Sequence, residues 1–139
     1  MKNILYIFSL FCTVSCTNFN SPNEVNISLI ESGAEVTVLE GETIYFGEIT
    51  EGEKIDLEFK IQNSGTGNLI ITKATASCGC TQLEYPKEII KQGVTEVIKV
   101  TFDSEGKLGK QTKKITLLTN ATPSIKILTI KGEVVPFQN

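Results

Sequence analysis

The chain has 139 residues, of which 40% are hydrophobic and 21% charged, and its formal net charge is −3. The length predicts one domain, and the composition is too apolar for a disordered protein. A negative net charge argues against a nucleic-acid-binding protein, which needs clustered cations to contact phosphates. The sequence contains no histidine, so the usual general base of a catalytic triad is missing. We therefore expect a protein that is not an enzyme.

The chain opens with the anatomy of a secretory signal. Basic Lys2 precedes an apolar run, Ile4 to Val14, that is too short to span a bilayer as a helix. The run leads into Thr-Val-Ser-Cys at residues 13–16, which resembles the lipobox of bacterial lipoproteins, with threonine where leucine is usual. The resemblance implies that residues 1–15 are removed and that Cys16 is acylated. Plain secretion with cleavage nearby and an uncleaved membrane anchor are the alternatives.

A lipid on Cys16 would hold the rest of the chain at a membrane surface without spanning the bilayer. The residues that follow are polar and rich in turn formers, so we expect residues 16–33 to be a tether. They include no acidic cluster directly after Cys16, of the kind associated with surface export in some lipoproteins. We therefore expect a lipid-anchored protein of the cell envelope that faces the periplasm.

From residue 34 to residue 139, hydrophobic and polar residues alternate with the period of half-buried β-strands. Turn-forming residues interrupt this alternation roughly every 8–12 residues, which is typical of a sandwich. We therefore predict an all-β, immunoglobulin-like (Ig-like) β-sandwich of about seven strands. The expected strands are EVTVLE (35–40), TIYFGEI (43–49), KIDLEFKIQN (54–63), LIITKATA (from 69 toward the cysteines), VTEVIKVTF (94–102), KQTKKITLLTN (110–120) and SIKILTIKGEVV (124–135).

Four lysines gather near the start of the sixth expected strand: Lys107, Lys110, Lys113 and Lys114. Charged residues, lysine above all, prevent the exposed edge of a sheet from pairing with other chains. We interpret this group as a solvated device on an edge strand.

Several short motifs between residues 43 and 134 together resemble a known bacterial family. They are FG.I..GE (46–53), F...N.G...L.I (59–71), SCGCT (77–81), QG (92–93), V.F with K.I...TN (100–120) and the closing L.I.G.V (128–134). In these features the chain is similar to the Ig-like family catalogued as domain of unknown function 1573. The resemblance implies an Ig-like sandwich, akin to domains of major sperm protein and ciliary proteins, in a secreted or lipid-anchored protein. It implies no known activity.

Cys78 and Cys80, separated by Gly79, are the only thiols left if Cys16 carries lipid and Cys12 leaves with the signal. In a regular strand their Cα atoms would lie about 6.6 Å apart, near the upper limit for a disulfide. Gly79 can take φ angles that a side chain forbids, which would fold the pair into a tight turn where a strained bond forms. The loop so closed is tiny, so its entropic stabilisation is small.

Three roles stay open for this cysteine pair. It is a structural bend, with small packed thiols or an adventitious disulfide, or a thiol-redox couple, or a soft-metal site. Cu(I) accepts two thiolates, whereas zinc needs about four ligands, for which Glu84 or Asp103 would have to come near. A cysteine nucleophile would lack its usual histidine partner.

We therefore expect no catalytic residue and no cofactor, with Cu(I) at Cys78 and Cys80 as the alternative. The expected function is that of a non-enzymatic binding or structural module. Its protein partner would pair with an exposed strand edge.

Overall fold

The computed structural model describes residues 33–138. The expected signal peptide, the lipidation site Cys16 and all but the last residue of the expected tether lie outside this range. The described part contains no helix that is long and apolar enough to cross a membrane. It forms eight strands: β1 (Val36–Val38), β2 (Thr43–Thr50), β3 (Lys54–Asn63), β4 (Ile71–Ala76), β5 (Thr81–Glu84), β6 (Thr95–Asp103), β7 (Gly109–Thr119) and β8 (Ile125–Val135).

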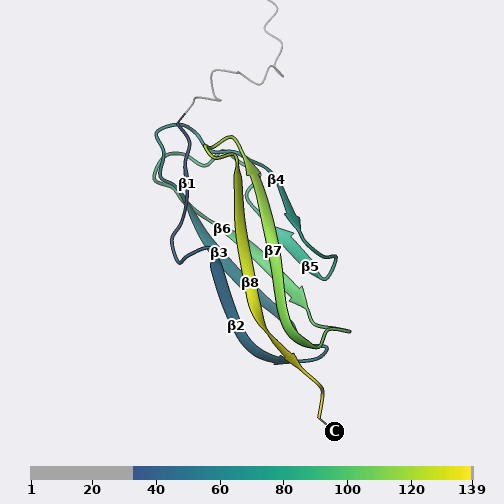
Figure 1. Ribbon diagram of the computed structural model, residues 1–139. Coiled ribbons are helices and arrows are strands. Elements are labelled where there is room, and N and C mark those ends of the chain that lie inside the picture. The colour runs from purple at the N-terminus through teal and green to yellow at the C-terminus, as the bar shows by residue number, and fades with distance from the viewer. Residues whose placement is uncertain (1–32, 139) are drawn as a thin grey trace, which may run out of the picture.

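The strands form two four-stranded sheets that pack face to face (Figure 1). Sheet A has the order β1-β3-β6-β5, and sheet B has the order β2-β8-β7-β4. Neighbouring strands are antiparallel except β2 and β8, which are parallel. The predicted all-β sandwich is confirmed.

At each lateral edge of the sandwich, two consecutive strands belong to different sheets. On one side β1 belongs to sheet A and the following β2 to sheet B, and on the other β4 belongs to sheet B and β5 to sheet A. Each switching strand covers only part of its neighbour. β1 pairs with residues 61–63 of β3, and β4 pairs with residues 115–119 of β7. Part of an interior strand is therefore left uncovered at each switch.

The predicted alternation supplies the core between the sheets. Ile98, Val100 and Phe102 of β6 are fully buried on one face, as expected, and Phe59 and Ile61 of β3 are buried beside them. Burial of side chains of this kind contributes roughly 1.5–3 kcal/mol each. Sheet B contributes a matching set of buried residues: Ile71, Ile115, Leu117, Leu128, Ile130 and Val134.

Strand β5 was not expected. Its four residues, TQLE, are too few to display an alternating pattern, and only Leu83 among them packs against the core as a hydrophobic side chain. The expected fourth strand ends at Ala76, before the cysteines. The loop after β5 is irregular, and it is held to the core by Ile90, which exchanges two 2.9 Å backbone hydrogen bonds with Leu69.

Candidate functional site

The Cys-Gly-Cys motif lies in the turn that carries the chain from β4 in sheet B to β5 in sheet A. A disulfide joins Cys78 to Cys80, and their Cα atoms are 5.3 Å apart. This separation is shorter than the about 6.6 Å expected in a regular strand. The sheet-changing bend therefore brings the two sulfurs within bonding distance.

The tight turn expected at Gly79 is present, but the special φ angle expected for this glycine is not. Its φ angle lies outside the positive region in which Gly106 and Gly109, at the next turn, are found. A Cβ built on Gly79 would meet no atom within 4 Å. The turn therefore requires no glycine for its backbone or for space.

Hydrogen bonds fix both ends of this turn. The N–H of Ser77 donates to the carbonyl of Lys114 at 2.9 Å, and the N–H of Lys114 donates to Oγ of Ser77 at 3.1 Å. At the other end, the N–H of Asp103 donates to the carbonyl of Cys80 at 3.0 Å. The disulfide turn is therefore attached to β7 of one sheet and to β6 of the other.

Thr81 lies against the disulfide on its inner side. Its hydroxyl Oγ1 is 3.4 Å from Sγ of Cys78 and 3.9 Å from Sγ of Cys80, and the residue is buried. Both cysteines are themselves partly exposed. The disulfide is thus supported from within and reachable from outside.

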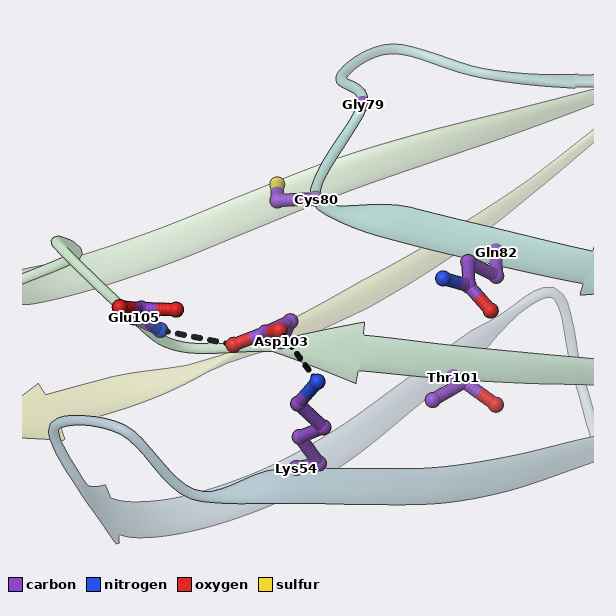
Figure 2. Close-up of a pocket in the computed structure, with 7 residues that line it drawn as sticks. All are labelled: Lys54, Gly79, Cys80, Gln82, Thr101, Asp103 and Glu105. Carbon is purple, nitrogen blue, oxygen red and sulfur yellow. Dashed lines mark hydrogen bonds and ion pairs between the residues drawn. The ribbon is translucent and has the colours of Figure 1, made fainter.

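A polar cleft of about 300 Å³ opens beside the turn, on the outer face of sheet A (Figure 2). It is lined by Lys54, Gly79, Cys80, Gln82, Thr101, Asp103 and Glu105. Figure 2 shows Asp103 between the amine of Lys54 and the backbone of Glu105. Nζ of Lys54 lies 2.9 Å from Oδ2 of Asp103, and the N–H of Glu105 donates to Oδ1 at 3.0 Å.

These contacts change the acidity of both charged groups. The backbone N–H of Glu105 and then the ammonium of Lys54 hold the pKa of Asp103 below its ordinary value. The hydrogen bond to Asp103 raises the pKa of Lys54 above its ordinary value. Both side chains reach solvent, so water screens the pair and its contribution to stability is small.

The carboxylates considered as metal ligands do not assemble around the sulfurs. Asp103 lines the cleft with Cys80, but its carboxylate is engaged by Lys54, and Glu84 lies outside this cleft. Across residues 33–138, no three side chains from His, Cys, Asp and Glu cluster in a way that could hold a metal. While Cys78 and Cys80 are bonded to each other, neither offers the thiolate that a soft metal requires.

The four lysines singled out in the sequence lie on and before β7, which is not an edge strand of its sheet. It lies between β8 and β4, so the interpretation as an edge strand is wrong for β7 as a whole. Because the pairing of β4 ends at residue 115 and Ser77 bonds the outward groups of Lys114, however, residues 109–113 of β7 do form an open edge. Lys110 and Lys113 lie on this open edge, with Lys114 at its end, so the interpretation that lysines protect an edge applies to this half of β7.

Sequence reasoning did not find the cleft residues Lys54, Gln82, Thr101 and Glu105. The first three come from β3, β5 and β6, and strand register brings them together. Alternation within one strand carries no signal for which residues of other strands are neighbours.

Solved structures with the same fold are distant in sequence. A protein of unknown function from Porphyromonas gingivalis matches at 19% identity and a TM-score of 0.62, over 80% of this chain and 51% of that one. The ASH / PapD-like domain of human CEP192 (PapD-like domain 7) matches at 8% identity and a TM-score of 0.59, over 98% of this chain and all of that one. The VesB protease of Vibrio cholerae matches at 15% identity and a TM-score of 0.55, over 73% of this chain and 31% of that one.

At these identities the likeness concerns the fold, which is an Ig-like, PapD-like β-sandwich. The chain spans about half the length of the Porphyromonas gingivalis protein and less than a third of VesB. No curated protein matches the sequence significantly. A family model described as Protein of unknown function (DUF1573) matches residues 37–134, so the chain belongs to that family.

Proposed function

We propose that the chain is a non-enzymatic Ig-like binding module. A lipid on Cys16 holds it at an envelope membrane, facing the periplasm, and a protein partner pairs with one of its exposed strand edges. The observation that carries this proposal is the pair of sheet switches, because each leaves backbone N–H and C=O groups of an interior strand uncovered. Such groups bind an extended segment of another protein by strand addition.

The chemistry of the molecule supports binding rather than catalysis. The sequence has no histidine to act as a general base. In the cleft beside the disulfide, the ammonium of Lys54 and the carboxylate of Asp103 are paired with each other at 2.9 Å. Neither charge is poised for proton transfer to a substrate.

The anchor is tested by substitution of Cys16. We expect Cys16→Ser to abolish incorporation of a labelled fatty acid and to move the protein from the membrane fraction to the soluble fraction. Cys12→Ser is the matched control, because the lipobox resemblance assigns no lipid to this residue. Equal lipid incorporation in Cys16→Ser and the unmodified chain would refute the anchor.

The partner is tested by crosslinking and pull-down from cells. We expect the double variant Cys78→Ser/Cys80→Ser to recover the same crosslinked partner, in the same amount, as the unmodified chain, because strand addition uses backbone groups. Loss of the partner from the double variant would instead assign recognition to the disulfide turn.

The second candidate function is thiol exchange at the disulfide, which its partial exposure favours. A thiolate of an external dithiol would attack one sulfur and form a mixed disulfide. Its second thiolate would then release Cys78 and Cys80 as thiols, while the dithiol is oxidised to its own disulfide. The reduced pair would also supply the two soft ligands that Cu(I) accepts.

Thiol titration with elemental analysis separates this function from simple binding. In the mature chain, without Cys12 and with lipid on Cys16, a redox or metal protein would show a reversible change between no titratable thiol and two, or one bound metal equivalent after reduction. Two thiols that stay unreactive after reduction, together with no bound metal, would exclude it.

A further inference from the structure

The half of β7 beyond the end of β4 has backbone groups without a strand partner. The N–H of Thr119 donates to the carbonyl of Ser124 at 2.8 Å, so the odd-numbered residues of β7 face β8 and the even-numbered residues face away from it. The hydrogen bonds that Lys114 exchanges with the last residue before the disulfide confirm this direction. The N–H and C=O groups of Lys110 and Thr112 therefore point to the open edge.

This edge is regular and has a defined end. The pairing of β7 with β8 runs without a bulge from Gly109 to Leu118. On the other side, pairing stops at Ser77, where the disulfide turn leads away to sheet A (Figure 1). Residues 110–113 thus form a template about 13 Å long, enough for an added strand of about four residues.

The four strands at the sheet edges are less suited than this part of β7 to pair with an added strand. β1 has three residues and β5 has four. The register of β2 is interrupted between Tyr45 and Gly47, and that of β4 between Ile71 and Lys73. Short strands and bulges are devices that stop strand addition.

The open edge of β7 carries a local positive charge in a chain whose net charge is negative. Lys110 and Lys114 are exposed on the outer face of sheet B. Lys113 points the other way, with Nζ 5.8 Å from the centre of the Phe102 ring. Among residues 33–138, the ion pairs are made by other lysines, and none involves these three. An added strand would therefore meet cations on both of its faces.

We infer that residues 110–113 of β7 bind an extended acidic segment of a partner protein as an added strand. The inference rests on the proposed binding function and assigns it an edge and a partner chemistry. The backbone of the segment pairs with Lys110 and Thr112, and its carboxylates face Lys110, Lys113 and Lys114. The segment continues sheet B beyond the end of β4, and its pairing with β7 ends at the disulfide turn.

The test uses the purified full chain, labelled for NMR, and a blocked synthetic peptide of alternating threonine and glutamate, about nine residues long. We expect the peptide to shift the amide signals of Lys110 and Thr112 and to slow their exchange with solvent. Matched peptides with glutamine or lysine in place of glutamate should have no such effect. Failure of the glutamate peptide to protect these two amides would overturn the inference.

Two variants distinguish the effect of the lysines at this edge from the effect of the net charge of the chain. Lys110→Gln/Lys113→Gln/Lys114→Gln should weaken peptide binding roughly ten-fold, through the loss of exposed ion pairs. Lys60→Gln/Lys91→Gln/Lys99→Gln changes the net charge equally but lies away from this edge, so binding should stay unchanged. Equal weakening in both variants would mean that only net charge attracts the peptide and would overturn the inference.

Thr112→Pro removes one N–H from the open edge and none from the pairing with β8, a position where a strand accepts proline. Peptide binding should be lost while the circular dichroism spectrum and the unfolding midpoint stay close to those of the unmodified chain. If this variant does not fold, exchange protection in the unmodified chain decides the question.

Recovery of the cellular partner by the triple variant distinguishes binding at β7 from binding at another edge. If the triple variant at residues 110, 113 and 114 still recovers the cellular partner by crosslinking, the binding function stands and the assignment to β7 fails. If the lysines serve only to block pairing, the triple variant will self-associate in analytical ultracentrifugation and the acidic peptide will not bind the unmodified chain.

Discussion

The side-chain amide of Asn63 donates a 2.9 Å hydrogen bond to the backbone carbonyl of Ile90, which ties the end of β3 to the loop between β5 and β6. The same nitrogen donates to the carbonyl of Gly67 at 2.8 Å. Its Oδ1 accepts from the N–H of Gly65 at 3.2 Å and, at 3.5 Å, from the N–H of Glu35. Asn63 is fully buried, so one side chain holds three segments together without contact with water.

We expect Asn63→Ala to lower the free energy of unfolding by about 3 kcal/mol, because it leaves buried backbone groups without a hydrogen-bond partner. Urea unfolding followed by circular dichroism measures the change. Asn68→Ala, in the neighbouring turn, is the control and should change stability by less than about 0.5 kcal/mol. A similar small change for Asn63→Ala would show that water replaces the lost amide.

The disulfide should contribute little to stability because the loop that it closes is so short. We expect Cys78→Ser/Cys80→Ser to lower the free energy of unfolding by about 1.5 kcal/mol, the loop-closure value for a bridge of this length. Urea unfolding of the unmodified chain with and without a reductant should show a loss of the same size. The reductant should leave the double variant unchanged. A much larger loss would mean that the bond holds the two sheets in place.

The ion pair beside the disulfide should make stability depend on pH in the acid range. Because the pKa of Asp103 is lower in the folded chain, its contribution is complete above the unfolded pKa, about 3.9, and is lost as pH falls through the folded value. We expect Asp103→Asn to reduce the fall in unfolding free energy below a pH of about 4. The fall for Lys54→Gln should lie between those of the unmodified chain and Asp103→Asn, since the hydrogen bond from the N–H of Glu105 to Asp103 remains. Urea unfolding at several acid pH values measures this, and identical profiles for all three chains would contradict it.

Most strands could be predicted because each buries one face against the other sheet. Phe59 and Ile61, and likewise Ile98, Val100 and Phe102, show the period of two that burial imposes. β5 was missed because four residues are too few for a period, and it forms because β6 offers it a partner at residues 99–102. Local pattern therefore predicts strands of sufficient length and misses those that depend on a neighbour.

The candidate site was predictable only in part. The sequence identified Cys78, Cys80 and the turn at Gly79, but it assumed a special φ angle for this glycine that the sheet-changing turn does not use. It identified the lysines, yet not that β4 stops beside Lys114. The cleft and the open edge both follow from where strands end and how they align, and residue type alone carries no such information.

Gly65 and Gly79 should respond in opposite ways to the same substitution. A Cβ on Gly65 would overlap the backbone of Gly33, Ala34 and Glu35, where the turn after β3 crosses the start of the domain. A Cβ on Gly79 would meet nothing. We expect Gly65→Ala to lower the free energy of unfolding by about 3 kcal/mol or more, because backbone cannot move aside as a side chain can.

Gly79→Ala should leave stability unchanged or raise it by up to about 1 kcal/mol, since alanine restricts the unfolded chain and fits the folded one. Urea unfolding of both variants measures the difference. If Gly79→Ala folds normally but recovers less crosslinked partner than the unmodified chain, then the exposed turn at Gly79 lies within the binding surface. Equal recovery would place the partner elsewhere, with the open edge of β7 as the position that strand register favours.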